Sequence, residues 1–345
     1  MPVVGIPRAL LYYQYYPMWR TFFEALGAGV VVSPPTTKGL LASGSAKLVS
    51  ETCLPTKTYC GHVLALHGHA DLVFVPAIRS LEEQVYNCSK FLGLPDLVQA
   101  TLSERPEVLT IDIDVNLGRG SVLHQLTKLG TRFSKNPLRL KRACDAALAA
   151  DTAYKQLMLR ERLTPPEAIA RTYPDVPPEL EIDSSRFKYD LRTPLTVAVV
   201  GHPYNIYDGY ITHNLLRRLR AWGLTVVTAE MASEEGLDAG TLALAGHHYW
   251  TYEDEVIGAA GHYMNGGVDG VIGVVSFACG PDSVMLSQIQ RAAKLPGARP
   301  WLGITIDEHT GEAGLVTRLE AFVDMLARRK RGLGRAAAAM RQGDN

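Results

Sequence analysis

The sequence predicts an α/β protein built from two similar doubly wound, Rossmann-like domains with parallel sheets. Short apolar runs of strand length alternate along the chain with segments of helical periodicity. A Pro-rich segment, residues 164–193, interrupts this alternation near the middle of the chain and is expected to be a domain linker. The alternation then begins again with a similar sequence. We therefore expect two domains that arose by duplication and face each other across a cleft.

The first domain, residues 1–163, begins with an apolar run at residues 3–6 that is typical of a buried strand. Apolar and aromatic residues then recur at helical spacing over residues 13–26, and Gly27 is expected to end this helix. Three further strands are expected at residues 29–32, 71–75 and 108–113, and a long charged helix at residues 136–163.

The second domain, residues 194–345, repeats this order. Residues 195–203 (LTVAVVGHP) resemble residues 3–7 (VVGIP), and the strand expected at residues 268–275 resembles residues 70–76. The strand expected at residues 301–306 corresponds to residues 108–113 in the same way. The remaining strand is expected at residues 224–227. Helices are expected at residues 212–222, 251–264 and 280–295, and a last helix after residue 312 is expected to continue to residue 322.

Composition excludes several classes of protein. The 345 residues are 47% hydrophobic, which suffices for two cores, and 35 acidic residues balance 35 basic ones. No basic patch for nucleic acid is expected from this balance, and the longest apolar runs are too short to cross a membrane. The odd number of cysteines, five, and the lack of a signal-peptide pattern predict a cytoplasmic protein without a disulfide framework.

Nucleotide-binding motifs are missing from the sequence. There is no G-x-x-x-x-G-K-[ST] motif and no G-x-G-x-x-G motif that opens a helix after the first strand. We therefore expect this chain neither to hydrolyse ATP by itself nor to bind a nicotinamide cofactor.

Three cysteines are the strongest candidates for a functional site. Cys53, Cys88 and Cys279 each lie at or just past the end of an expected strand, or next to Gly or Pro. Ligands bind at this edge of an open α/β sheet. Three thiolates from separate loops suit a metal ion, or an iron–sulfur cluster with one corner not bound by cysteine. Spacing alone leaves an equal alternative, which is that the three are buried core residues.

The sequence around these cysteines is distinctive. Residues 5–13 (GIPRALLYY), 88–96 (CSKFLGLPD), 279–283 (CGPDS) and 307–314 (DEHTGEAG) carry most of the pattern. In these segments the chain resembles the acyl-CoA dehydratase activase-related proteins. These are relatives of the 2-hydroxyacyl-CoA dehydratase subunits and of the double-cubane cluster proteins. The resemblance extends from about residue 3 to residue 325.

The resemblance implies one [4Fe-4S] cluster per chain, held by Cys53, Cys88 and Cys279. It also implies an ATP-hydrolysing activator protein as electron donor, and a small substrate or an acyl-CoA that is reduced or dehydrated at the cluster. A homodimer or a heterodimer with a related subunit is possible. The alternative is a non-catalytic protein for electron transfer, cluster maturation or cluster binding, and a three-cysteine zinc site is a third hypothesis. Ser89 stands where many relatives have proline after the second cysteine.

Two cysteines remain. Cys60 follows Cys53 by seven residues and is a possible fourth ligand, whereas Cys144 is expected to be structural. A double-cubane cluster that takes three cysteines per cubane would need six, so five favour a single cubane.

Glu308, His309 and Arg8 are candidate catalytic residues. Carboxylates and an imidazole crowd residues 307–312, where proton affinities can shift. The competing interpretation is that Thr310 and Glu312 cap a helix and that Arg318 pairs with a carboxylate. Arg8 is expected to bind an anion, such as a phosphate of coenzyme A, or to form a buried salt bridge.

The remaining candidate residues are those that could cap the helix after Cys279, and the histidines. Asp282 or Ser283 is expected to cap the helix after Cys279, whose amino end would favour the thiolate form of that cysteine. The alternative is an ordinary strand-to-helix turn. His202 is expected near the cleft, and like His309 it follows a predicted strand directly. The other clustered histidines, which lack zinc-finger spacing, are expected to be packing or surface residues: His62, His67, His69, His247 and His248.

Overall fold

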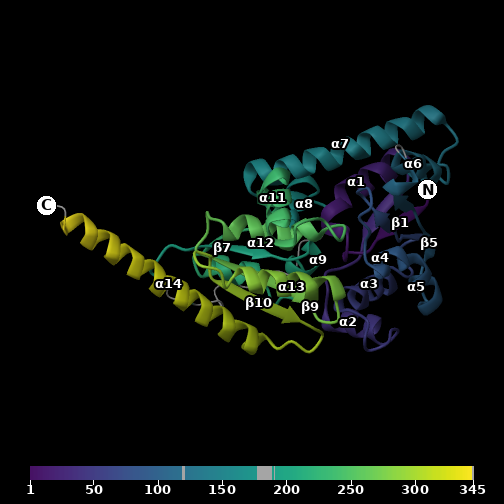
Figure 1. Cartoon of the computed structure of the whole chain (residues 1–345). Coiled ribbons are helices and arrows are strands. Elements are labelled where there is room, and N and C mark those ends of the chain that lie inside the picture. Colours follow the sequence, from purple (N-terminus) through teal and green to yellow (C-terminus); the bar gives the residue numbers. More distant parts are fainter. Residues whose placement is uncertain (119–120, 177–188, 190, 344–345) are drawn as a thin grey trace.

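The computed structural model describes residues 1–118, 121–176, 189 and 191–343 (Figure 1). It confirms a mixed α/β fold with parallel sheets. In the first unit the strands lie in the order β2 (Gly29–Val32), β1 (Val3–Ile6), β3 (Leu72–Phe74) and β5 (Glu107–Leu109). In the second unit they lie in the order β8 (Thr225–Val227), β7 (Thr196–Val200), β9 (Gly270–Ser276) and β10 (Trp301–Ile306). In each unit the order is second, first, third and fourth strand, so the two units share one topology.

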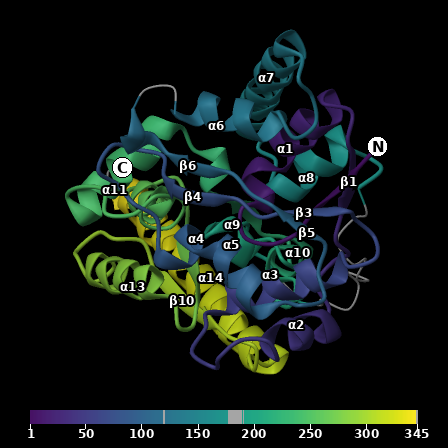
Figure 2. The same ribbon diagram turned by 90° about the vertical axis from the view of Figure 1, so that its right-hand side faces the viewer.

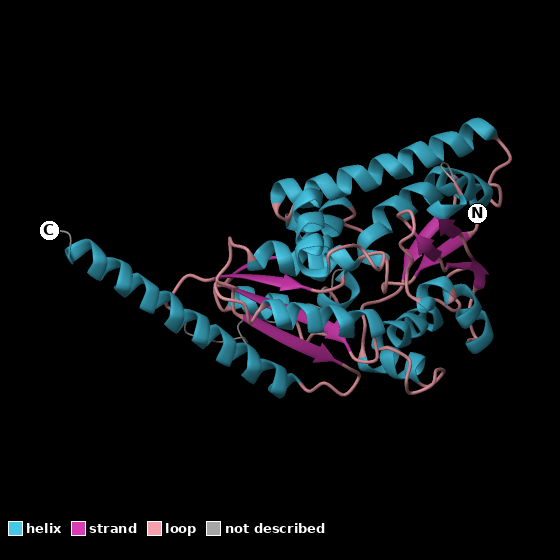
Figure 3. Ribbon diagram, in the orientation of Figure 1, coloured by secondary structure: helices cyan, strands magenta, loops and turns pink. Residues whose placement is uncertain are grey.

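Burial explains why these runs form strands. All seven residues of β9 are buried, and β7 and β3 are buried along almost their whole length. A strand covered on both faces must be apolar throughout, which is why these runs are continuous rather than alternating. Helices lie on both faces of the second sheet (Figure 3).

The predicted strand at residues 108–113 is two strands in the structure. β3 and β5 continue beyond Pro76 and Thr110 into a second parallel pair, β4 (Ala77–Ser80) and β6 (Asp112–Asp114) (Figure 2). This pair carries the chain toward Cys88, because Asn87 donates its backbone N–H to the carbonyl of Arg79 (2.7 Å).

Helix α1 (Tyr12–Ala25) confirms the first predicted helix and packs along α7 (Pro137–Glu161). Pro17 lies inside α1 and cannot donate to the carbonyl four residues earlier, that of Tyr13. The hydroxyl of Tyr154 in α7 donates to this carbonyl instead (2.8 Å). The proline is thereby accommodated without leaving a buried acceptor unpaired.

Helices α2 (Lys38–Ser45) and α3 (Leu54–Ala65) pack backbone to backbone at two glycines. A Cβ on Gly44 would lie 2.1 Å from the Lys57 carbonyl oxygen, and one on Gly61 would lie 2.2 Å from the Leu40 carbonyl oxygen. Neither backbone can move without separating the two helices.

We expect Gly44→Ala to destabilise the protein by about 1–3 kcal/mol, because the added methyl forces α2 away from α3. Urea unfolding measures this change. The matched control is Gly39→Ala in the same helix, where the nearest atom would be 4.0 Å away. This control should be neutral or stabilising, since alanine favours helix over glycine. Equal losses in the two variants would show that the close packing does not matter.

Part of the expected linker is helical. Helix α8 (Pro165–Thr172) begins at a capping box in which Glu167 accepts from the backbone N–H of Thr164 (2.8 Å). Glu167 also pairs with Arg220 of the second unit (2.6 Å). Residues 177–188 and 190 of the expected linker lie outside the described residues.

The predicted helices of the second unit are present, with shifted ends. The helix expected at residues 251–264 begins later, because a 3₁₀ turn at Glu253–Glu255 precedes it. The last helix, α14, is longer than expected and extends away from the body of the molecule (Figure 1). The predicted helices are α10 (Leu215–Ala221), α12 (Ile257–Met264), α13 (Gly280–Ala292) and α14 (Glu312–Gly343), whereas α9 (Pro203–Ile206) and α11 (Glu234–Ala245) were not predicted.

One hydrophobic core spans both units and contains strand residues of both sheets, for example Val4 and Ile272, and a second core lies within the second unit. A parallel bridge between Tyr86 and Trp250 also joins them. None of the described helices combines the length and the apolar character needed to cross a membrane. Loops of both units therefore meet at a tightly packed junction.

Candidate functional site

Each of the three candidate cysteines is the residue that precedes the first turn of a helix. Cys53 stands before α3, Cys88 before α4 (Ser89–Leu92), and Cys279 before α13. All three are partly exposed and unpaired by disulfides. The backbone N–H groups of a first helical turn are unpaired within the helix, and they carry partial positive charge. Each thiol therefore lies where a helix amino end can partly offset the negative charge of a thiolate.

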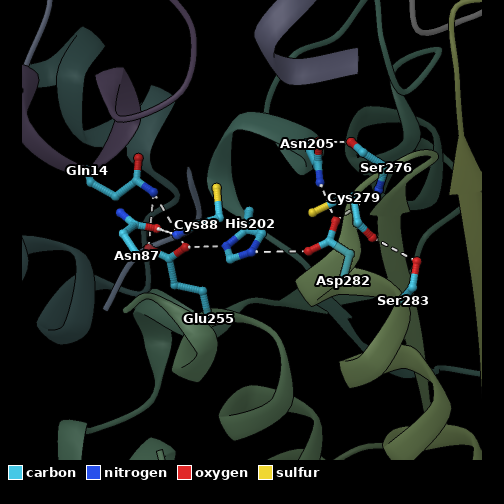
Figure 4. Close-up of polar contacts among 10 residues, drawn as sticks. All are labelled: Gln14, Asn87, Cys88, His202, Asn205, Glu255, Ser276, Cys279, Asp282 and Ser283. Carbon is cyan, nitrogen blue, oxygen red and sulfur yellow. Dashed lines mark hydrogen bonds and ion pairs between the residues drawn. The ribbon is translucent and has the colours of Figure 1, made fainter. Parts of the chain in front are cut away.

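The three cysteines interact with one another. Cys88 and Cys279 line the same small pocket, and Figure 4 shows the Cys279 sulfur pointing toward the side on which Cys88 lies. Burial is the main cause that raises the pKa of Cys88, and the charge of Cys53 adds to it. Burial also raises the pKa of Cys279, and the charges of Asp282, Cys53 and Cys88 raise it further. Cysteines from both units thus meet at the junction.

Two predictions about Cys279 are wrong. The amino end of α13 does not make its thiolate the favoured form in the protein without a ligand, because burial and the Asp282 carboxylate outweigh it. Neither Asp282 nor Ser283 caps the helix: Asp282 accepts from the backbone N–H of Ser276 (3.0 Å), and the Ser283 hydroxyl donates to the Cys279 carbonyl (2.7 Å). The turn also places Ala278 in the left-handed region, with φ 62°. Non-glycine residues adopt this conformation at a cost, so the turn that delivers Cys279 is held by its surroundings.

A largely buried chain of charged and polar side chains lies beside Cys88 and Cys279 (Figure 4). His202 Nδ1 lies 2.9 Å from a carboxylate oxygen of Glu255, and its Nε2 lies 3.2 Å from one of Asp282. Gln14 of the first unit donates to Glu255 from its Nε2 (3.1 Å). On the other side, the Ser276 hydroxyl donates to Asn205 Oδ1 (2.6 Å). This chain connects α1 of the first unit to α13 of the second.

His202 is an imidazolium at neutral pH. Burial alone would lower its pKa, but the charges and hydrogen bonds of Asp282 and Glu255 outweigh burial and raise it to about 10. The ring of Tyr204 stacks on the imidazole, with centroids 4.9 Å apart. The prediction that His202 lies near the junction is confirmed, whereas its partner Glu255 and the adjacent Asn87 were not predicted.

Glu308 is held by an ion pair between the two units. Its carboxylate lies 2.6 Å from the Nζ of Lys57, a side chain only 3% exposed that also donates to the Ser50 carbonyl (2.8 Å). Burial favours the neutral acid, but the hydrogen bond and charge of Lys57 outweigh it and lower the pKa of Glu308. Lys57 lies one helical turn after Cys53 on α3, so this ion pair lies close to the first cysteine.

In the rest of the 307–312 segment, side chains either close a turn or pair with residues outside the segment. His309 is exposed, and its backbone N–H donates to Asp307 (3.0 Å). The Thr310 hydroxyl donates to the Asp307 carboxylate (2.8 Å), so it closes a turn. The expected pairing of Arg318 with a carboxylate is wrong, because Arg318 donates to the Gly303 carbonyl (2.5 Å). Glu312 instead pairs with Arg218 (2.5 Å).

Arg8 is buried, with 3% of its surface exposed, and its guanidinium lies 5.6 Å from the ring centroid of Tyr12. Its backbone N–H donates to the Ser33 hydroxyl (2.8 Å), which also contacts Nδ1 of His62 (2.8 Å). Burial, together with the charge of Arg8, lowers the pKa of His62 to about 3, so this histidine is a neutral packing residue. The structure thus places Arg8 inside the protein rather than on an open ligand surface.

Cys60 and Cys144 are both inside the hydrophobic core. Burial raises the pKa of Cys60 to about 12, which keeps it a thiol. It lies two turns beyond Cys53 on α3, a helix whose first ten residues are all buried. Both cysteines pack as small apolar side chains.

The three cysteines suit a cluster better than a single metal ion. Among the described residues no three His, Cys, Asp or Glu side chains are grouped closely enough to hold one ion. The cysteines of an iron–sulfur cluster bind different irons, so their sulfurs lie farther apart than the ligands of one ion. Three partly exposed thiols at three helix amino ends, within electrostatic reach of one another, fit a cluster of this kind.

Comparison with known proteins identifies the family. No curated protein matches the chain. Residues 3–232, two thirds of the chain, match the family described as CoA enzyme activase uncharacterised domain (DUF2229). The matched part contains Cys53, Cys88, Lys57 and His202 and ends before Cys279. The chain therefore belongs to the CoA enzyme activase DUF2229 family.

Proposed function

We propose that this protein holds a [4Fe-4S] cluster between its two units through Cys53, Cys88 and Cys279. In this proposal it acts in the manner of the 2-hydroxyacyl-CoA dehydratases, with an ATP-hydrolysing activator as electron donor. The observation that carries the proposal is that the three cysteines come from both units and precede three separate helices. Membership of a CoA enzyme activase family supports the link to this chemistry.

The cluster, when bound, would supply low-potential electrons and an iron open to a ligand. The residues of this chain have other tasks. The amino ends of α3, α4 and α13 offset the negative charge of the thiolates. The imidazolium of His202, held between Glu255 and Asp282, keeps a proton beside Cys88 and Cys279. The Lys57–Glu308 ion pair connects the loop after β10 to α3, the helix that Cys53 precedes.

The proposal predicts the metal content of the protein. Prepared without oxygen, the protein should be brown and contain about four irons and as much acid-labile sulfide per chain, as a single cubane requires. Iron and sulfide analysis with absorption spectroscopy makes the measurement. Stoichiometric zinc without sulfide would refute the proposal. Turnover of acyl-CoA substrates with the activator and ATP then separates a catalyst from an electron carrier or a maturation protein.

A further inference from the structure

The pocket that Cys88 and Cys279 share also contains two buried polar groups with no role in the site described so far. Asn87 and Thr251 line it, one from each unit, together with His202 and Trp250. Its volume is about 20 Å³. A single water molecule needs roughly 10–15 Å³, so this space takes one or two non-hydrogen atoms.

Asn87 presents a fixed donor. Its side chain is 8% exposed, and its Oδ1 accepts from the backbone N–H of Cys88 (3.0 Å; Figure 4). This bond identifies the oxygen, because only an acceptor can satisfy that N–H. The Nδ2 group must therefore be on the other side, where it is buried and has no hydrogen-bond partner among the described residues.

Thr251 also has a buried polar atom without a hydrogen-bond partner among the described residues. It is 5% exposed, and its buried Oγ1 has no hydrogen-bond partner within the described part of the chain. Its backbone N–H donates to the Tyr86 carbonyl (3.3 Å), next to the parallel bridge between Tyr86 and Trp250. This pairing brings Thr251 beside Asn87. Folded proteins rarely leave buried polar groups unpaired, so two at one pocket point to a ligand that satisfies them.

The charge around the pocket restricts the ligand. The carboxylates of Glu255 and Asp282 flank the single imidazole of His202, and the carboxyl group of Glu253 also lines the pocket, so an anion is repelled. An ammonium group cannot pair with Asn87, because Nδ2 only donates. A neutral group that accepts hydrogen bonds satisfies both conditions.

We propose that Asn87 and Thr251 bind the oxygen of a neutral carbonyl or hydroxyl group beside Cys88 and Cys279. The ligand accepts from Asn87 Nδ2 and from the Thr251 hydroxyl, and its buried end has one or two non-hydrogen atoms. The inference rests on the proposed function only in placing this oxygen next to the cluster, since the binding itself needs no metal.

The probe is formamide, a neutral amide with a two-atom carbonyl, and formate is its charged counterpart of the same shape. Saturation-transfer NMR on the full-length anaerobic protein measures both. The per-atom limit on ligand affinity restricts a three-atom probe to a dissociation constant of roughly millimolar or weaker. We expect formate to bind at least about tenfold more weakly than formamide.

Variants test the two anchors. Thr251→Val removes only the unpaired hydroxyl, and Asn87→Asp keeps the acceptor for Cys88 but removes the donor. Each should weaken formamide binding by about fivefold or more, the value of one hydrogen bond. Thr251→Ser should bind like the wild type. Thr58→Val, a buried threonine outside this pocket that donates to the Leu54 carbonyl, should not change binding.

Unchanged formamide affinity in both Thr251→Val and Asn87→Asp would overturn the inference, as would equal affinity for formate. Iron and sulfide are measured in the same samples. Formamide binding that depends on Thr251 in protein without iron would support this inference while refuting the cluster. A full cluster with binding that no variant changes would refute only the inference.

Discussion

Cys279→Ala should lose most of its iron, to below roughly a tenth of the wild-type content. Loss of a group that merely orients a metal ligand already costs about 10–100-fold in affinity, and loss of a direct ligand should cost more. Cys279 is also the only one of the three cysteines in the second unit, so the remaining pair cannot hold a cluster between the units. Iron analysis and the visible absorption of anaerobic protein provide the measurement. Cys53→Ala and Cys88→Ala should behave alike.

Two matched controls come from the same chain. Cys144→Ala and Cys60→Ala remove cysteines that lie in the hydrophobic core. Both should keep a full complement of iron, although each leaves a small cavity that lowers stability. If Cys60→Ala loses its iron as completely as Cys53→Ala, the site has four cysteines and no open corner. If Cys279→Ala keeps its iron, the proposed ligand set is wrong.

Asp282→Ala should destabilise the protein by about 3–5 kcal/mol, the cost of breaking a buried ion pair from one side. Asp282 is 1% exposed and pairs with His202 (3.2 Å), and it accepts the backbone N–H of Ser276 (3.0 Å). Its loss leaves an imidazolium with one carboxylate instead of two, and a buried N–H without its acceptor. Urea unfolding of apoprotein measures the effect without interference from metal binding.

The pH dependence of this loss has a defined sign. His202 has a folded-state pKa of about 10, above its ordinary value near 6.5, so the folded state binds the proton more tightly. The stability from this proton is complete below about pH 6.5 and disappears as the pH rises toward 10. The difference between the wild type and Asp282→Ala should shrink over that range. Asp112→Ala, which breaks an exposed pair with Arg79, should cost less than about 1 kcal/mol, and a similar value for Asp282→Ala would contradict the prediction.

The strands could be predicted because their burial is visible in the sequence. β9 is buried at every residue and is apolar at almost every residue, and so it is readable as a continuous run. Helix α3 could not be predicted in this way, because its first ten residues are all buried and include Lys57 and His62. A helix buried on all sides shows no periodic apolar face, and polar groups on it are satisfied by residues far away in the sequence.

In the candidate site, too, some residues could be recognised from the local sequence and others could not. The cysteines have recognisable neighbours in the sequence, whereas Glu255 meets Gln14 and His202 only through the packing of the two units. Lys57 could have been suspected, since it follows Cys53 by one helical turn, but its partner Glu308 is 251 residues away. Arg8 follows a strand end as a ligand-binding residue would, yet tertiary packing buries it. Local sequence can identify a cysteine as a candidate ligand, but it does not show which distant side chain lies beside that cysteine.

The division of the cysteines between the units has a consequence for biosynthesis. Cys53 and Cys88 leave the ribosome while more than half the chain, including β9 and the turn at Ala278, is still to be made. At translation rates of about 5–20 residues per second, the interval before Cys279 is made is roughly ten to forty seconds. During that time the nascent chain offers two thiols without the third. They are then open to oxidation or to capture of a stray ion, because the proposed three-cysteine site is complete only when the second unit has been made.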